Sequence, residues 1–120
     1  MTRHNKIGHL YEKWALLSLI LKGYMPIGSN VVTGRGTGAG EIDLIMRKGK
    51  TLIFIEVKKR KSYAKGLEAI TIENQMRVVR ASAAFLKRNP IFQSYRIRYD
   101  AVICVPWHWP KHLKDAWRVL

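Results

Sequence analysis

The stretch that decides the fold runs from Gly40 to Lys61 and reads GEIDLIMRKGKTLIFIEVKKRK. Two apolar segments within it, residues 41–47 and 51–59, are rich in β-branched residues and are separated by KGK. Such a pattern predicts two antiparallel strands joined by a tight turn. Each of these strands is interrupted by an acid, although acids are scarce in the chain as a whole.

The interrupting acids are Asp43 in the first strand and Glu56 in the second. Because side chains alternate across a strand, Glu56 and Lys58 share one face, near the strand's C-terminal end. A tight hairpin brings Asp43 close to Glu56 across the ladder. Two adjacent carboxylates repel unless a cation or proton intervenes. Mg²⁺ binds carboxylate oxygens and shares substrate phosphates, so the pattern indicates metal-assisted phosphodiester chemistry, with Lys58 orienting water or neutralising charge.

An alternative is that Glu56 forms an ion pair with Lys58 or a neighbouring Arg, and spacing alone favours this alternative, because D-x₁₂-E-x-K is a short and permissive pattern. What favours the metal site is where the acids lie. The chain has only eight Asp and Glu, and three of them fall between Glu41 and Glu56. We expect Glu41 to support the metal ligands rather than bind the metal itself.

Length and composition predict one domain spanning residues 1–120. There are 22 Lys and Arg against 8 Asp and Glu, which gives a net charge of +14. This excess favours polyanionic partners, and we expect nucleic acid, DNA before RNA, rather than a membrane or a ribosome surface.

Cys104 is the single cysteine, so it predicts a buried thiol, without a disulfide or a cysteine zinc site. His108 and His112 flank Pro110, and we expect no metal there.

The longest apolar run, residues 14–21, is too short to span a bilayer and lacks the features of a signal peptide. We therefore expect a soluble cytoplasmic protein that does not enter a membrane. The glycine-rich segment 33–40 lacks the Lys-Ser/Thr ending of a phosphate-binding loop.

The remaining elements follow from periodicity. Residues about 5–22 predict a helix that stops at Gly23. Its apolar stripe is expected to comprise Ile7, Leu10, Trp14, Leu17 and Leu21. Residues 24–32 predict a weak edge strand with Pro26, and residues 60–70 predict a polar loop.

A second helix is predicted over 72–87, capped by Thr71. Its core face is expected to comprise Met76, Val79, Ala83 and Leu86. Residues 96–105 predict another strand, in which Asp100 is expected to be a structural ion-pair partner, and the tail after Pro110 has a short helical pattern. The order helix, three strands, helix, strand predicts an α/β fold with a mixed sheet flanked by helices, the last strand being parallel to its neighbour.

Asp43 followed by EVK on the next strand resembles the PD-(D/E)xK nuclease superfamily, which has the restriction-endonuclease-like fold. The segments GHLYEKWA, LKGY, SN, GEIDLI, LIFIEVKKR and EAIT, in this order over about residues 8–105, resemble more closely the YraN-like family of bacterial proteins. The resemblance implies an αβββαβ core, in agreement with the reading above.

The resemblance also implies a Mg²⁺ or Mn²⁺ site with Asp43 and Glu56 as ligands and Lys58 as the catalytic lysine. Glu12 matches an acid that many such nucleases add to the metal site, and Gln75 matches a polar helix position that often completes it. The implied activity is metal-dependent hydrolysis of phosphodiester bonds in DNA, including branched or recombination intermediates. The alternative is a non-catalytic nucleic-acid-binding module that retains the fold. Many resolvase-like relatives work as homodimers, so a dimer is also expected.

Basic residues flank the predicted site, and we expect them to contact phosphates. They are Arg35, Lys59, Arg60, Lys61 and Lys65. Trp107 and Trp109 could stack on bases, pack the tail onto the core or line a dimer interface, and packing is favoured.

Overall fold

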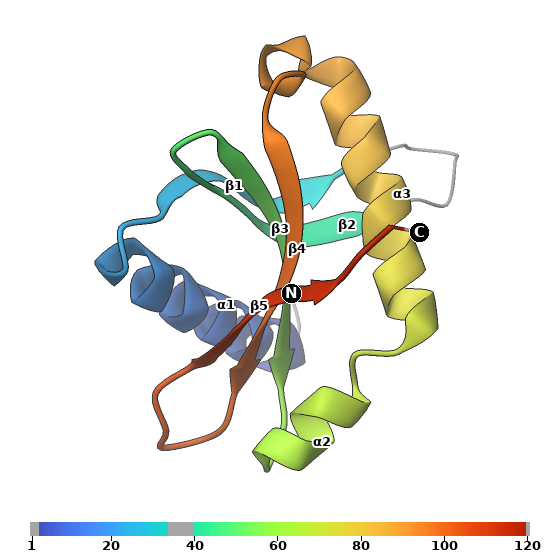
Figure 1. Ribbon diagram of the computed structural model, residues 1–120. Coiled ribbons are helices and arrows are strands. Elements are labelled where there is room, and N and C mark those ends of the chain that lie inside the picture. Colours follow the sequence, from blue (N-terminus) through green and yellow to red (C-terminus); the bar gives the residue numbers. More distant parts are fainter. Residues whose placement is uncertain (1–2, 34–39, 120) are drawn as a thin grey trace.

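The computed structural model describes residues 3–33 and 40–119, and it describes side chains from His9 onward. Its helices and strands follow one another along the chain as in Figure 1. The helical elements are α1 (Arg3–Leu21), α2 (Tyr63–Glu68), α3 (Ile72–Arg88) and the short 3₁₀ helix η1 (Pro90–Phe92). The strands are β1 (Met25–Val32), β2 (Glu41–Lys48), β3 (Thr51–Lys59), β4 (Arg96–Cys104) and β5 (Lys111–Trp117).

The five strands form one sheet in the order β1-β2-β3-β4-β5. Antiparallel pairing joins β1 to β2, β2 to β3 and β4 to β5, whereas β3 and β4 are parallel. The connection from β3 to β4 passes through α2, α3 and η1. The predicted restriction-endonuclease-like order of helix, three strands, helix and strand is confirmed, as are the mixed sheet and the edge position of β1.

The sheet separates two apolar cores, one under α1 and one under α3 (Figure 1). Ile53 and Ile55 of β3 point to the α1 side, and Leu52 and Phe54 point to the α3 side. The apolar segment of β3 is therefore buried on both faces, as expected of a central strand. Glu56, the last residue in this buried run, is only 3% exposed. A carboxylate placed so deeply requires a partner.

The helix α1 turns a different face to the sheet from the one predicted, and the predicted face of α3 is confirmed only in part. In α1, Ala15 and Leu19 are buried, while Leu10 is 64% and Leu21 68% exposed. Trp14 and Leu17 of the predicted stripe are also exposed. In α3 the buried residues are Val78, Ala81, Ser82 and Phe85. Of the predicted face, Val79 and Leu86 are partly buried against the same core, while Met76 and Ala83 are exposed. Both segments are helical as predicted, but apolar residues surround α1, so periodicity alone did not determine which of its faces meets the sheet.

The tail was predicted to be helical, and this is wrong because residues Lys111–Trp117 form β5. A helix of this length has little stability of its own, whereas β4 offers a row of backbone groups that need partners. The segment 60–70, predicted to be a loop, contains α2, which is capped by the Ser62 hydroxyl accepting a hydrogen bond from Lys65 N. The predicted cap of α3 is confirmed, because Thr71 Oγ1 accepts from Asn74 N.

A buried polar network ties β5 to β4 at Asp100, which has no exposed surface. Its carboxylate accepts hydrogen bonds from Arg98, from His112 and from the backbone N–H of Asp115 at 2.7–2.9 Å. Burial opposes ionisation of Asp100, but these donors outweigh it and lower its pKa. The prediction that Asp100 is a structural ion-pair partner is confirmed.

Cys104 is buried as predicted, and burial raises the pKa of its thiol to about 11.

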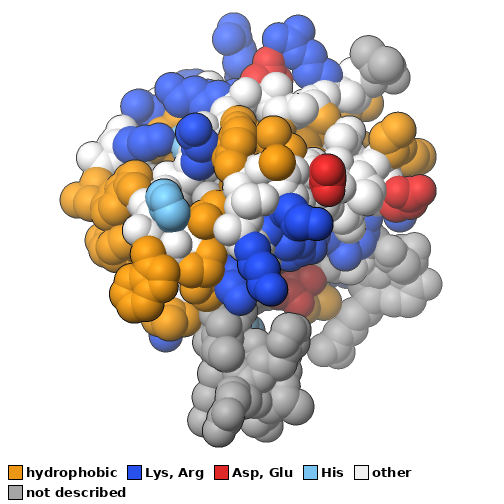
Figure 2. Space-filling model, turned by 90° about the horizontal axis from the view of Figure 1, so that it is seen from below, with side chains coloured by type: hydrophobic (Ala, Val, Ile, Leu, Met, Phe, Trp, Pro, Cys, Tyr) orange, Lys and Arg blue, Asp and Glu red, His pale blue; other side chains and the backbone are white. Residues whose placement is uncertain are grey.

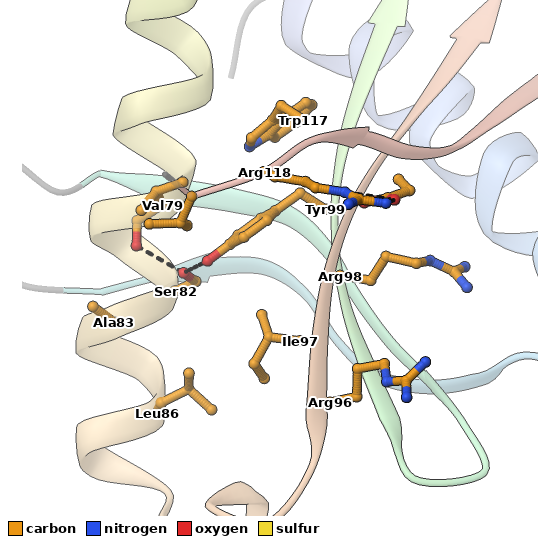
Figure 3. Close-up of a pocket in the computed structure, with 12 residues that line it drawn as sticks. Val79, Ser82, Ala83, Leu86, Arg96, Ile97, Arg98, Tyr99, Trp117 and Arg118 are labelled. Atoms are coloured by element: carbon orange, nitrogen blue, oxygen red, sulfur yellow. Dashed lines mark hydrogen bonds and ion pairs between the residues drawn. The ribbon is translucent and has the colours of Figure 1, made fainter.

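On the other side of the sheet, a hollow of about 670 Å³ lies between α3 and the β4–β5 pair (Figure 3). Tyr99 crosses it, and its hydroxyl lies 2.8 Å from that of Ser82 (Figure 3). No helix in the described part of the chain is long and apolar enough to cross a membrane.

Candidate metal centre

The candidate site lies where β2 and β3 diverge. Their ladder runs from Lys48 paired with Thr51 to Leu44 paired with Ile55. Beyond that point Asp43 Oδ2 accepts a hydrogen bond of 2.8 Å from the backbone N–H of Val57. The carboxylate thus takes the place of a backbone acceptor, and the strands separate without leaving this donor unpaired.

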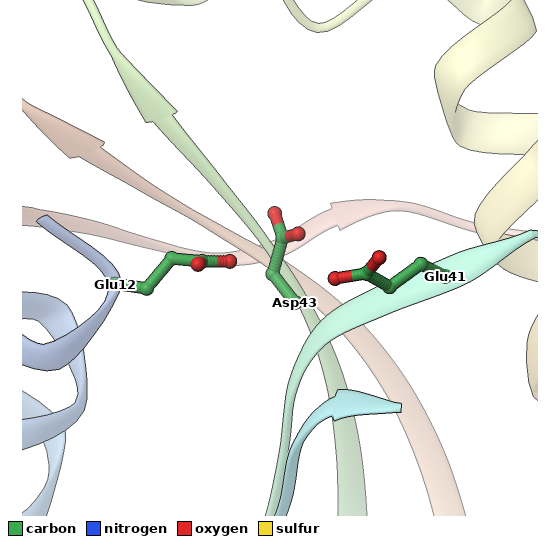
Figure 4. Close-up of side chains that lie close together, drawn as sticks. All are labelled: Glu12, Glu41 and Asp43. Carbon is green, nitrogen blue, oxygen red and sulfur yellow. The ribbon is translucent and has the colours of Figure 1, made fainter. Parts of the chain in front are cut away.

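Three carboxylates meet at this divergence. Glu12 comes from α1, while Glu41 and Asp43 come from β2, and one oxygen of each lies within 4.8 Å of the others. In Figure 4 the side chains of Glu12 and Glu41 point toward each other, and Asp43 stands between them. Oxygen ligands at such spacing are what Mg²⁺ and Mn²⁺ bind in proteins. Glu12, Glu41 and Asp43 are therefore the residues that could hold a divalent cation.

Asn30 of β1 lies against two of these acids. We assign its amide nitrogen to the side facing them, because an amide oxygen there would meet only acceptors. The nitrogen then donates to Glu41 Oε1 at 2.8 Å and lies 3.0 and 3.1 Å from the two oxygens of Glu12. Asn30 has a φ of 51°, a left-handed backbone conformation that Asn tolerates better than most residues. Its geometry holds Glu12 and Glu41 at the same point.

The local field disfavours a full set of negative charges. Burial, followed by the charge of Glu56, raises the pKa of Asp43 to about 7, although the hydrogen bond from Val57 favours its ionised form. Burial also raises the pKa of Glu12, and the nearby charges of Glu41 and Glu56 add to this effect. A cation at the centre of the carboxylates would relieve this repulsion.

Glu56 lies beside this cluster but has its own cations. Its Oε1 is 3.0 Å from Lys58 Nζ and 3.2 Å from an Arg77 guanidinium nitrogen. The other oxygen, Oε2, is buried and has no hydrogen-bond partner among the described residues. Arg77 comes from α3, and its side chain passes over Gly40 at the start of β2. The ion pair that the sequence left open as an alternative is thus present.

The structure brings together some of the predicted site residues. Glu12 and Asp43 are adjacent as predicted, but the third carboxylate within reach is Glu41, which had been expected only to support the ligands. Glu56 and Lys58 lie next to them as an ion pair. Gln75 donates instead to the Ile70 carbonyl at 3.5 Å, at the start of α3.

Sequence reasoning missed Arg77 and Asn30. A signal for Arg77 existed, because a buried Glu56 calls for a cation and α3 must pack over it. Asn30 lies in the SN segment that contributes to the family resemblance, but its contact with the acids depends on its left-handed backbone and on the position of α1.

The predicted phosphate-contacting residues begin at the end of β3. Lys59, Arg60, Lys61 and Lys65 are all exposed. The Lys59 Nζ lies 5.5 Å from the ring centre of Tyr11, on the α1 side of the sheet. Arg35 lies outside the described residues. The four described cations are accessible to solvent, as contact with phosphates would require.

Fold and site together define an α/β protein with a candidate divalent-cation centre where two central strands diverge. The family with the description "Uncharacterised protein family UPF0102" matches residues 11–104, and the chain belongs to this family. The predicted resemblance to the YraN-like family is thereby confirmed.

Curated relatives match along almost their whole length. The UPF0102 protein amb4503 of Paramagnetospirillum magneticum is 43% identical over 112 residues, which cover 93% of this chain and 87% of that protein. A UPF0102 protein of Parvibaculum lavamentivorans is 42% identical, with 94% and 82% covered. One of Sinorhizobium medicae is 41% identical, with 92% and 88% covered.

Proposed function

We propose that this protein is a Mg²⁺- or Mn²⁺-dependent nuclease that hydrolyses phosphodiester bonds in DNA. The observation that carries the proposal is the meeting of Glu12, Glu41 and Asp43 within 4.8 Å, beside the Lys58–Glu56 pair. In a chain of net charge +14, the balance of surface charge does not explain why three carboxylates meet at one point. Held beside exposed cations, they fit a cation-assisted reaction on a polyanion.

A divalent cation suits these residues. All the donors are carboxylate oxygens, the type that Mg²⁺ prefers, and two of the three have raised pKa values that a cation would lower again. Glu56 Oε2 is a further buried oxygen without a partner among the described residues. When bound there, Mg²⁺ or Mn²⁺ would lower the pKa of a water molecule and offset charge on the phosphate.

The chain's own residues have separable roles in this proposal. Glu12, Glu41 and Asp43 hold the cation, and Asn30 orients the first two. Lys58 is held by Glu56 at 3.0 Å and is mostly buried, so its ammonium group has a fixed position from which to donate to a phosphate oxygen. A fixed donor needs no reorganisation during the reaction.

The competing proposal is a binding module that keeps the fold and does not turn over. It is favoured by one observation, the pairing of Glu56 with both Lys58 and Arg77, which neutralises this acid without metal. The module would use the same exposed cations for phosphates. Both proposals predict nucleic-acid binding, and only the first predicts cleavage.

The experiment incubates the protein with single-stranded, duplex and branched DNA, in Mn²⁺ and in chelator. We expect cleavage of at least one DNA with Mn²⁺, none in chelator and none by Asp43→Asn. Asp115→Asn is the matched control, because Asp115 of β5 pairs with Arg118, just after that strand, and its replacement should not affect cleavage. Cleavage by Asp43→Asn at the parental rate would reject the site, and absence of cleavage on all substrates would favour the binding module.

A further inference from the structure

The turn between β4 and β5 exposes two tryptophans. The Trp107 side chain is fully exposed, and Trp109 is 52% exposed while packing edge-on against Trp14 of α1 at 5.0 Å between ring centres. The expectation that both tryptophans pack the tail onto the core is therefore wrong for Trp107 and met only in part by Trp109. A fully exposed indole contributes nothing to the folded core.

Trp107 also has an unfavourable backbone, with a φ of 67°. For a bulky side chain, this left-handed conformation is strained, and such strain often accompanies a binding function. The positive φ belongs to a β-turn that the hydrogen bond from His108 N–H to the Val105 carbonyl closes at 3.0 Å, and Gly or Asn fills such a position with less strain. The fold therefore accounts for the backbone of Trp107 but not for an exposed indole at this place.

A hollow of about 540 Å³ lies between this turn and the start of α2. Tyr63 and Trp109 give it aromatic walls, while Lys61, His108 and Lys111 add polar or cationic groups. The Lys111 ammonium lies 4.4 Å from the ring centre of Tyr63. Aromatic rings beside cations are the combination that single-stranded nucleic acid requires, since bases stack and phosphates pair with cations.

The charge around the hollow has one sign. Residues 58–65 contain five Lys and Arg, residues 105–114 contain two, and neither stretch contains an acid. Figure 2 views the side where α2 and the β4–β5 turn lie, and it shows Lys and Arg side chains between a hydrophobic area and acidic side chains. A second copy of the chain would bring the same positive charge to this surface, whereas a nucleic acid would neutralise it.

The hollow lies one strand away from Lys58 of the candidate site. Ile103 lines the hollow and is the ladder partner of Lys58 in the parallel β3–β4 pair. The Arg60 N–H bonds to the Cys104 carbonyl at 3.1 Å, so the basic segment after β3 lies along the start of the turn. A strand of nucleic acid bound at the turn would have phosphates within reach of this segment.

We infer that the β4–β5 turn and this hollow bind an unpaired stretch of single-stranded nucleic acid. Its bases stack on Trp107 and Trp109, and its phosphates contact Lys61 and Lys111. The inference deepens the proposed function by naming the substrate class, a nucleic acid with an unpaired segment, and rests on that function for its link to cleavage. The binding itself requires neither metal nor turnover.

The test measures binding in chelator by fluorescence anisotropy. The probes are an oligothymidylate of about twelve nucleotides, within the range of known single-strand sites, and an abasic oligomer with the same number of phosphates. We expect the oligothymidylate to bind more tightly and to quench tryptophan fluorescence. Trp107→Gly suits the left-handed backbone, and it should weaken oligothymidylate binding about five- to a hundredfold while leaving abasic binding unchanged.

Two further variants sharpen the result. Trp107→Phe keeps a ring and should retain most of the preference for bases. Lys61→Ala should weaken both probes, whereas Lys50→Ala, at the far β2–β3 turn, should weaken neither. Circular dichroism of each variant checks that the fold is intact.

Equal affinity for the two probes would overturn the inference, and so would an equal loss of both in Trp107→Gly. Binding to phosphatidylglycerol vesicles that depends on Trp107, with oligomer binding unaffected, would assign the surface to a lipid. A dimer that Trp107→Gly dissociates, again with oligomer binding unaffected, would assign it to a second copy. Base preference without cleavage would reject the nuclease proposal alone, and cleavage without base preference would reject this inference alone.

Discussion

The side chain of Asp43 on β2 accepts a hydrogen bond of 2.8 Å from the backbone N–H of Val57 on β3. One carboxylate thus has two tasks, since its Oδ2 completes the backbone pairing where the strands diverge while the group also faces Glu12 and Glu41. The divergence and the carboxylate cluster therefore depend on the same residue.

The first prediction concerns stability without metal. Because burial and nearby acids raise the pKa of Asp43 from 3.8 to about 7, the folded state binds a proton more tightly than the unfolded state. The contribution of Asp43 to stability should therefore decline as pH rises from about 4 to 7. Asp43→Asn keeps an oxygen for Val57 and removes the charge, so it should stabilise the metal-free protein at pH 7.5 by at least about 1 kcal/mol.

Chemical denaturation in chelator measures the stability that Asp43→Asn gains without metal. The same experiment with Mn²⁺ measures the stability that metal binding adds. Mn²⁺ should stabilise the parent and leave Asp43→Asn nearly unchanged, since binding to the folded state alone raises its stability. Equal stabilisation of both proteins by Mn²⁺ would show that Asp43 is not a ligand. Asp115→Asn should behave like the parent under both conditions.

The second prediction concerns Asn30. Removing its amide frees Glu12 and Glu41, so Asn30→Gly and Asn30→Ala should each weaken Mn²⁺ binding about tenfold or more, measured by calorimetric titration. Gly accepts the φ of 51° without strain, and the Ala variant should be about 1 kcal/mol less stable than the Gly variant. Unchanged Mn²⁺ affinity in Asn30→Gly would limit Asn30 to a backbone role.

The third prediction concerns the connection after β3. Gly66 of α2 is buried against Ile103, and a Cβ added at Gly66 would overlap the Ile103 side chain. Gly66→Ala should destabilise the protein by about 1–3 kcal/mol, measured by urea denaturation. In the Ile103→Ala background the added methyl should cost much less, giving a coupling energy in a double-mutant cycle. Additive effects would contradict the close packing of α2 on β4.

The fourth prediction concerns salt. If four or more of the exposed cations near β3 contact phosphates, the dissociation constant for duplex DNA should rise about a hundredfold or more between 50 and 200 mM salt. Lys61→Ala should lower the slope by about one, and Lys50→Ala should leave it unchanged. A nearly flat salt dependence would indicate that this basic surface meets something other than nucleic acid.

Much of the fold follows from sequence because the residue pattern of β2 and β3 fits only a pair of strands joined by a turn. Their apolar residues suit strands, KGK suits only a turn, and the alternation correctly places Glu56 and Lys58 on one face. The helices were located correctly, but α1 carries apolar residues all round. Whether Trp14 or Leu19 meets the sheet depends on the tertiary fit, which periodicity does not encode.

The site was predictable to the extent that it is local. Asp43, Glu56 and Lys58 lie on two adjacent strands, so a hairpin register is enough to bring them together. Asn30 of β1 reaches Glu41 of β2 and Glu12 of α1, and Arg77 of α3 reaches Glu56 of β3, so these contacts depend on tertiary packing. Asn30 further requires a left-handed backbone that no pattern indicated. The strand β5 was missed although it pairs with the preceding strand β4, because the segment PWHWP between them gives no tight-turn signal and the residues after Pro110 have a short helical pattern.

The most direct test of the central claim is a paired gel-shift and nicking assay on Glu56→Gln and Lys58→Ala. Glu56 holds both Lys58 and Arg77, so Glu56→Gln should release two cations toward DNA, abolish nicking and bind DNA as tightly as the parent or more tightly. Lys58→Ala should also abolish nicking but bind less tightly, because it removes a cation. Persistence of nicking in Glu56→Gln at the parental rate would contradict the account.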